Sequence, residues 1–392
     1  MRINFALGGF MLKVKFNLVF VVFFVVIVST FNVRAGADPL WWVESDAHGT
    51  IPPEIIRNPN FTEPSPSGRS ATPDSIFPSE ECLNFDFQGV EFLDNPASQH
   101  GYGSVAYPYE ISRYEVTNCQ YAYFLNEVAA YADPHLLYDD RMGTWNQSGI
   151  LKITDSGVSI YLVMKDMMNK PVNYVSWLSA ARFVNWLQNR QSHLGADTEH
   201  GTYDLTQHFS YKNAIRSDTA TFAIPSADEW YKAAYYDPSH WDEDSYWRYA
   251  TRSNFQPEFG PASVNGHFLN PGEFKANYNS SSNWRGTLKG NVLSVGSTGE
   301  ASASYFGTQD MNGNVSEWTK ELICMDQRCG RFFIGGDANS NYAPDGSRYV
   351  PGLLLKYTAL NTSNDGDDIY RYWRTGFRIV RLRPAIQTTA NR

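Results

Sequence analysis

Hydrophobic and polar positions follow three different patterns along the chain, and each pattern predicts a different kind of structure. Residues 85–92 and 109–116 place apolar side chains at close to every second position, which is typical of strands. Residues 374–382 do the same near the end of the chain and predict a terminal strand. Between residues 251 and 316, Gly, Asn, Ser and Pro are scattered without a helical period, which predicts loops held by specific contacts.

Three helices are predicted from their starting residues. Thr117 with Gln120, and Ser226 with Glu229, have the spacing of a capping box, in which each side chain binds the backbone N–H of the other residue. Ser176 precedes an apolar stripe with helical spacing, which buries one face of the helix that carries it. That stripe consists of Trp177, Ala180, Ala181, Val184 and Leu187.

The order of these elements predicts the fold class and the extent of the domain. Strands at both ends, helices in the first half and an irregular second half indicate one α+β domain over residues 81–383. The segments 133–170 and 190–222 have the character of insertions into it. Residues 384–392 form a short C-terminal tail.

The N-terminus has the pattern of a secretory signal peptide. Cationic residues precede the apolar run Leu18–Val28, and Val33-Arg34-Ala35 offers a small-residue cleavage site. We therefore expect residues 1–35 to be removed on export, to a secreted or periplasmic location. The alternative is an uncleaved segment that anchors the protein in a membrane, although the run is shorter than the roughly 20 apolar residues that a stable span needs.

Residues 36–80 are predicted to be a linker rich in Pro and Ser. Seven prolines stand between positions 52 and 78. Because proline fixes φ and lacks a backbone donor, this segment favours an extended conformation over a helix or a sheet.

Composition and charge narrow the possible classes of function. The chain has 392 residues, of which 42% are apolar and 15% aromatic, which excludes wholesale disorder. It carries 32 Lys and Arg against 41 Asp and Glu, a formal net charge of −9. Loss of residues 1–35 removes four cations and no acid, which makes the net charge −13. An acidic chain of this kind is not expected to bind nucleic acid, because that affinity comes from clustered Lys and Arg.

Four cysteines are too few for a disulfide scaffold in a chain of this length. Cys324 and Cys329 are predicted to form a local disulfide in a connecting loop, given an exporting compartment. The alternative is a redox or copper-binding pair, which needs a lowered thiol pKa. Cys82 and Cys119 are predicted either to bridge the N-terminal edge of the domain or to remain buried free thiols.

Six short motifs occur in an order that resembles the sulfatase-modifying factor family, whose best-known member is formylglycine-generating enzyme. They lie at residues 109–118, 171–177, 224–234, 306–318, 335–336 and 376–378, and include Gly313-Asn314-Val315-Ser316-Glu317-Trp318 and Gly376-Phe377-Arg378. The resemblance implies a loop-rich variant of the C-type-lectin-like fold.

The family's enzyme oxidises a sulfatase cysteine to formylglycine with oxygen and copper, using two cysteines that follow a Gly-Gly pair. In this chain the resemblance places Ser340 and Asp345 at those two positions, after Gly335-Gly336. A serine is neither a thiolate nucleophile nor a soft ligand for Cu(I), and a carboxylate cannot form a mixed disulfide. We therefore predict no catalytic residues of the family type, no bound copper and no formylglycine formation.

A calcium site is predicted in residues 310–317, where oxygen-bearing side chains recur at nearly every second position, as Ca²⁺ prefers. The resemblance implies ligation by the side chains of Asp310 and Glu317 and the carbonyls of Gly313 and Val315. It also implies a second site that begins at Asn277 and the carbonyl of Tyr278. The alternative is an Asx-rich turn that satisfies its own backbone.

The histidines and the aromatic residues favour a ligand-binding function. The histidines His193, His200 and His208 lack the H-x-x-x-H spacing of a metal pair. Aromatic residues near acidic ones suggest a groove for a peptide or carbohydrate, or else rings that wedge the core. They are Trp241, Tyr246, Trp247, Tyr249, Tyr370, Tyr372 and Trp373. The expected function is a secreted binding module or divergent enzyme of the family. The alternative is an oxygen-dependent oxidoreductase of the formylglycine-generating type that acts on a protein cysteine.

Overall fold

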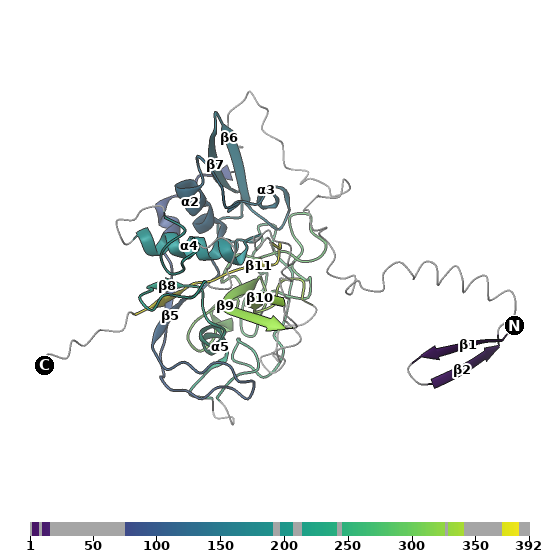
Figure 1. The fold of residues 1–392 in the computed structure, drawn as a ribbon. Helices are drawn as coiled ribbons and strands as arrows, with labels where there is room; N and C mark the ends of the chain where they lie inside the picture. Colours follow the sequence, from purple (N-terminus) through teal and green to yellow (C-terminus); the bar gives the residue numbers. More distant parts are fainter. Residues whose placement is uncertain are drawn as a thin grey trace. The chain divides into compact units, whose positions relative to one another are not determined.

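The computed structural model describes residues 2–7, 10–15, 75–190, 197–206, 214–240, 245–325, 328–340 and 371–383, with the backbone alone at 2–7, 10–15, 323–325 and 328–329 (Figure 1). Strands β1 (Arg2–Leu7) and β2 (Phe10–Lys15) pair as an antiparallel hairpin in a unit separate from the rest of the chain. The apolar run Leu18–Val28 and its cleavage site lie outside the described residues, so the signal peptide stays a prediction. No helix in these ranges has the length and apolar character that a membrane span requires.

The first sheet brings the two ends of the domain together. It contains β4 (Phe87–Val90), β5 (Tyr109–Ser112), β12 (Val380–Leu382) and β8 (Phe222–Ala223) in the order β4-β5-β12-β8, all antiparallel. The predicted strands at 85–92 and 109–116 are therefore present in shortened form.

The predicted continuous strand over 374–382 is wrong, because its two halves pair with different partners. Thr375–Gly376 form β11, which runs parallel to β9 (Ser316–Met325) in a sheet that β10 (Arg328–Ile334) completes. Val380–Leu382 form β12 in the first sheet. Arg378 lies between the two halves, with its side chain fully buried.

The insertion at 133–170 builds a third sheet. It contains β6 (Ile150–Asp155) and β7 (Val158–Met164), with β3 (Ser75–Ile76) paired to the other edge of β7, and short helix α3 (Arg141–Thr144) precedes β6. In Figure 1 the β6–β7 hairpin projects from the same side of the domain as α2 and α4.

The three predicted helices are confirmed. They are α2 (Asn118–Val128), α4 (Trp177–Arg190) and α5 (Ala227–Tyr235), and both predicted capping boxes are complete. The Ser176 hydroxyl accepts from the amide of Ser179 at 3.1 Å at the start of α4. Apart from the 3₁₀ turn η4 (Glu300–Ser302) and the first residue of β9, residues 251–316 contain no helix or strand, as expected.

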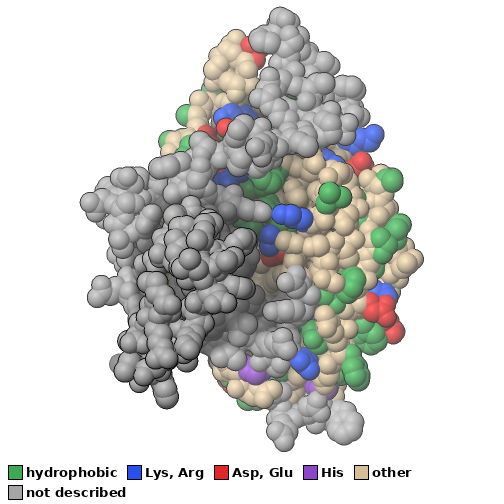
Figure 2. Space-filling model, turned by 90° about the vertical axis from the view of Figure 1, so that its right-hand side faces the viewer, with side chains coloured by type: hydrophobic (Ala, Val, Ile, Leu, Met, Phe, Trp, Pro, Cys, Tyr) green, Lys and Arg blue, Asp and Glu red, His purple; other side chains and the backbone are tan. Residues whose placement is uncertain are grey.

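Large aromatic side chains fill the core. Phe183 of α4 lies within 6.5 Å, centroid to centroid, of five other rings, which are Phe85, Tyr121, Phe124, Trp186 and Phe377. Tyr246, Tyr249 and Trp373 are buried as well, so these three serve the core rather than an open groove. Hydrophobic side chains reach the described surface in Figure 2 only in small separate groups.

A disulfide joins Cys82 of the 3₁₀ turn η2 (Glu80–Leu83) to Cys119 of α2, with 5.6 Å between the Cα atoms. Of the two predicted alternatives, the bridge is the one present. It ties the start of the domain to its first helix.

Candidate functional site

A buried ion pair joins Glu317 of β9 to Arg378 at the centre of the domain. Arg378 Nε lies 2.5 Å from Glu317 Oε2, and Nη2 lies 2.7 Å from Oε1. The indole N–H of Trp230 donates to the same Oε2 at 2.7 Å. Neither side chain of the pair contacts solvent. The other guanidinium N–H groups donate to the carbonyls of Ser112, Arg113 and Gln309.

Asp310 is a second buried carboxylate in this region. Its Oδ2 accepts from the amide of Gly296 at 2.6 Å, and its Oδ1 lies 3.5 Å from the hydroxyl of Thr298. The pKa of Asp310 is raised to about 6, chiefly by burial and in part by the charge of Glu317, against the lowering effect of the Gly296 hydrogen bond and the charge of Arg378.

Glu115 is a third buried carboxylate, which the sequence analysis did not identify. Its Oε1 accepts from the side-chain amide Nδ2 of Asn314 at 3.1 Å, whereas its Oε2 is buried without a hydrogen-bond partner. Burial raises the pKa of Glu115 well above its ordinary value, and the charges of Asp310 and Glu317 add to that rise. An unpartnered buried oxygen of this kind indicates that the cluster is chemically incomplete.

The three carboxylates face a single guanidinium, which leaves two formal negative charges in the interior when all groups are ionised. Uncompensated buried charge is costly, so this cluster requires protons or a cation. Among the residues that the structure describes, no three Asp, Glu, His or Cys side chains could hold a metal on their own. A Ca²⁺ ion takes six to eight oxygens and commonly uses backbone carbonyls, so a calcium ion here would need carbonyl oxygens in addition to these carboxylates.

Asn277 and Gly313 lie side by side next to this cluster. They form an isolated parallel bridge, and the amide of Asn314 donates to the carbonyl of Asn277 at 2.9 Å. Gly313 has φ +98°, and a Cβ there would collide with the Asn277 carbonyl oxygen. The side-chain Oδ1 of Asn277 is buried without a partner. Asn277, which is predicted for the second calcium site, therefore lies next to the residues predicted for the first calcium site.

The family resemblance also implies carbonyl ligands at Tyr278 and Val315, and these two residues differ in their surroundings. The Tyr278 carbonyl accepts from the amide and the hydroxyl of Ser281, at 3.3 and 2.8 Å, so it closes a turn of its own chain segment. Val315 is fully buried directly before β9. The structure thus places Asn277 beside Gly313 and brings the charges of Asp310 and Glu317 near each other, whereas the Tyr278 carbonyl is already used.

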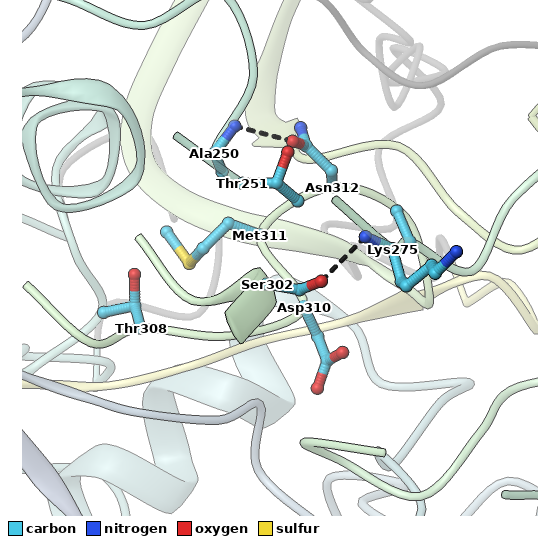
Figure 3. Close-up of a pocket in the computed structure, with 9 residues that line it drawn as sticks. Ala250, Thr251, Lys275, Ser302, Thr308, Asp310, Met311 and Asn312 are labelled. Atoms are coloured by element: carbon cyan, nitrogen blue, oxygen red, sulfur yellow. Dashed lines mark hydrogen bonds between the residues drawn. The ribbon is translucent and has the colours of Figure 1, made fainter. Parts of the chain in front are cut away.

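A small pocket leads toward Asp310 (Figure 3). In that view, Asp310 lies beside Ser302, whose hydroxyl accepts from the backbone N–H of Lys275 at 2.7 Å. Thr251, on the opposite side, has a buried hydroxyl without a partner. The side chains that line this pocket are mostly small or polar. They belong to Ala250, Thr251, Lys275, Ala276, Ser302, Thr308, Asp310, Met311 and Asn312.

Ser340, where the family resemblance is predicted to place the first reactive cysteine, forms part of a closed turn. Its amide donates to the carbonyl of Asp337 at 3.0 Å, and its hydroxyl accepts from the amide of Asp337 at 3.1 Å. Its carbonyl accepts from the amide of Asn279 at 2.7 Å. Asp345 lies outside the described residues.

Cys324 and Cys329 stand directly opposite each other in the antiparallel pairing of β9 with β10. They were expected in a connecting loop, and instead lie within the strands, next to the last residue of β9 and the first residue of β10. Both precede Gly335-Gly336, so the chain order separates them from the family's reactive position at Ser340.

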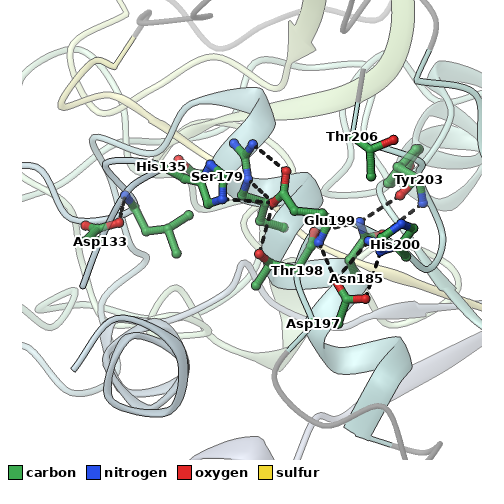
Figure 4. Close-up of polar contacts among 12 residues, drawn as sticks. Asp133, His135, Ser179, Asn185, Asp197, Thr198, Glu199, His200, Tyr203 and Thr206 are labelled. Carbon is green, nitrogen blue, oxygen red and sulfur yellow. Dashed lines mark hydrogen bonds and ion pairs between the residues drawn. The ribbon is translucent and has the colours of Figure 1, made fainter. Parts of the chain in front are cut away.

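The described histidines of the insertions take part in hydrogen-bonded contacts around α4 (Figure 4). Arg182 of α4 binds the carboxylate of Glu199 through two nitrogens, at 2.7 and 3.0 Å, and His135 Nε2 lies 3.4 Å from the same carboxylate. His200 is 2.9 Å from Asp197. These contacts attach two insertions to the helix. His193 and His208 lie outside the described residues.

Comparison with known proteins identifies the family of the chain. The model of the sulfatase-modifying factor enzyme 1-like domain matches residues 84–382. The crystal structure of CarF is similar at 20% sequence identity and a TM-score of 0.45, over 76% of this chain and 98% of that one. Treponema denticola variable protein 1 is similar at 15% identity and a TM-score of 0.40, over 76% of this chain and 95% of that one. No curated protein sequence matches.

The matched range contains the α+β domain from β4 to β12 and the whole buried cluster of Glu115, Asp310, Glu317 and Arg378. It is also the range in which the sequence motifs follow the family's order. The chain therefore belongs to the sulfatase-modifying factor family.

Proposed function

We propose that this protein is an exported, calcium-stabilised binding domain of the sulfatase-modifying factor family that does not generate formylglycine. The observation that carries the proposal is the role of Ser340. Its amide and its hydroxyl are both used in the turn with Asp337. This residue therefore has a sufficient structural role at the position where the family's enzyme needs a reactive thiolate.

The chemistry of the family's reaction explains why this replacement matters. The enzyme binds copper and its substrate cysteine through sulfur, and only a thiolate is both a strong nucleophile and a soft ligand. A serine hydroxyl stays protonated near neutral pH and does not form disulfides. We therefore expect the loss of the reaction itself, not a change in its rate.

A peptide assay tests this proposal. The purified full chain is incubated with a peptide that carries the sulfatase cysteine motif, together with oxygen, Cu(I) and a thiol reductant. Mass spectrometry is expected to find no conversion of the peptide cysteine to the aldehyde. A double variant, Ser340→Cys with Asp345→Cys, serves as the matched comparison. Conversion by the wild-type chain would contradict the proposal.

Calcium is proposed as a structural ion at the buried carboxylate cluster. Glu115 and Asp310 would supply carboxylate oxygens, and Gly313 and Val315 would supply carbonyls. Glu317 would share its carboxylate with Arg378. The ion would cancel the two excess negative charges and join the 310–317 turn to the segment after β5.

Export and ligand binding complete the proposal. The leader pattern at residues 1–35 supports export, and so does the Cys82–Cys119 bridge, because disulfides persist in oxidising compartments. A peptide or carbohydrate is the proposed class of ligand, since the chain keeps the family's fold without its reactive cysteines.

The second candidate function is an oxidase that uses Cys324 and Cys329. It is supported by the direct opposition of these two residues in the pairing of β9 with β10.

A further inference from the structure

Three aromatic rings meet just beyond the end of β4, and two of them are exposed while Phe306 is partly buried. Phe92 is 47% exposed and Tyr305 is 38% exposed. The ring of Phe92 lies 6.1 Å from that of Tyr305 and 6.4 Å from that of Phe306, and the latter two are 5.2 Å apart. Side chains of this size normally bury most of their area, so two neighbouring exposed rings indicate an interaction surface.

The backbone holds Phe92 in this outward position. Its φ is +63°, a left-handed conformation that bulky residues rarely adopt. Lys232 of α5 is buried, and its ammonium donates to the carbonyl of Phe92 at 2.8 Å. The ring is thus presented by a fixed turn, and such local strain is typical of positions kept for function.

The free edge of β4 adjoins these rings. Among the described strands, β4 has a neighbour only on its β5 side. Gly89 of β4 is exposed, and a Cβ there would meet no atom within 4 Å. A Cβ on Gly307, which follows Phe306, would lie 2.8 Å from the side-chain oxygen of Gln88 in β4. The strand and the ring group therefore form one continuous surface.

Acidic side chains surround this surface. Glu91 and Asp94 are exposed on either side of Phe92. Glu300 and Asp86 are also largely exposed, and both contact the guanidinium of Arg113. Four carboxylates lie beside two cations, Arg113 and the buried Lys232, whose ammonium interacts with Asp94. The surface therefore keeps a negative character, which favours a positively charged partner.

We propose that the β4 edge and the Phe92–Tyr305–Phe306 group dock an extended, cationic segment of a partner protein. The segment adds as a strand beside β4 through main-chain hydrogen bonds, and one of its apolar side chains rests on the three rings. Its Lys or Arg side chains face Glu91 and Asp94. This site is separate from Ser340 and goes beyond the proposed function.

Fluorescence anisotropy with a labelled peptide of alternating Lys and Val tests the proposal on the full chain. We expect saturable binding that weakens as salt rises, and none for the matched peptide of alternating Glu and Val. Phe92→Gly removes the ring and suits the positive φ, so it is expected to fold and to weaken binding about tenfold or more. Gly89→Lys, which has open space for its side chain, is expected to weaken binding as well. Tyr131→Ala, at a ring that is 84% exposed elsewhere, is the control and should bind normally.

Several outcomes would overturn the proposal. Failure of the Lys–Val peptide to bind the wild-type chain, or equal binding by Phe92→Gly and wild type with matching melting curves, would do so. Sedimentation that shows a dimer of the wild type and a monomer of Phe92→Gly would assign the surface to a second copy of the chain. Binding of a neutral oligosaccharide that Phe92→Gly loses, without peptide binding, would assign it to carbohydrate.

Discussion

Arg378 and Glu317 meet through two hydrogen bonds, with neither side chain exposed to solvent. The pair connects β9 to the segment between β11 and β12, and its remaining donors reach the carbonyl of Ser112 in β5. Two sheets are thereby joined by one guanidinium. The same cation is the only positive charge identified at the cluster of Glu115, Asp310 and Glu317, within the described part of the chain.

The first prediction concerns the removal of this cation. Arg378→Met leaves three buried carboxylates without their positive partner, and breaking a buried pair in this way costs about 3–5 kcal/mol of unfolding free energy. Urea unfolding measures the change. Arg381→Met is the matched control, because Arg381 makes a similar two-nitrogen contact with Glu110 but is partly exposed. Its expected cost is about 1 kcal/mol. Equal losses of unfolding free energy in the two variants would show that the buried pair contributes no more to stability than the partly exposed pair.

The second prediction concerns calcium. EDTA is expected to lower the melting temperature, and added Ca²⁺ to restore it, because an ion that binds only the folded state at 100 times its Kd adds about 2.7 kcal/mol of stability. Asp310→Asn and Glu115→Gln should each reduce the response to calcium, measured by thermal unfolding and by calorimetric titration. Glu91→Gln, at an exposed carboxylate, should respond like wild type. Indifference of the wild type to EDTA would refute a structural calcium ion.

The elements that could be predicted from the sequence are those with local signals. The caps at Thr117 and Ser226 place the starts of two helices within one residue, because the capping box is a local hydrogen-bond pattern. The loop-rich character of residues 251–316 also follows from composition alone. These features depend on residues that are close in sequence, so no knowledge of distant contacts was needed.

Long-range contacts explain what the sequence could not predict. An arginine in a strand-like run is ordinarily exposed, yet Arg378 is buried because Glu317 and three carbonyls converge on it from distant segments. Glu115 was missed for the same reason: it alternates with apolar neighbours like an outward-facing strand residue, but is only 2% exposed. The partners that give these residues their role lie 61 positions away for Arg378 and Glu317, and 199 positions away for Glu115 and Asn314, where sequence patterns carry no signal.

The third prediction concerns acid sensitivity at Glu229, the capping residue of α5. Burial alone would raise the pKa of Glu229, but the charge and hydrogen bonds of Arg216, with those of Tyr107 and the Ser226 amide, outweigh it and lower that pKa. A carboxylate with a lowered folded-state pKa adds stability above its unfolded pKa, about 4.5, and loses it as the pH falls through the folded value. Glu229→Gln should therefore cost stability at pH 7 and cost much less near pH 3, as measured by urea unfolding at both values. A loss that does not depend on pH would assign the effect to packing.

The last prediction concerns Cys324 and Cys329. Residues directly opposite in an antiparallel pair have Cα atoms about 4.5–5.5 Å apart, within the range that a disulfide spans. We therefore expect a non-reduced digest to yield a cross-linked peptide that contains both residues, and a thiol titration of the native chain to find no free cysteine. Because the enclosed loop is short, the double change to serine should cost about 2 kcal/mol, against about 4 kcal/mol for the same change at Cys82 and Cys119, which are 37 positions apart. Free thiols at 324 and 329 that bind Cu(I) would instead favour the oxidase candidate, since a copper site requires thiolates that a disulfide does not provide.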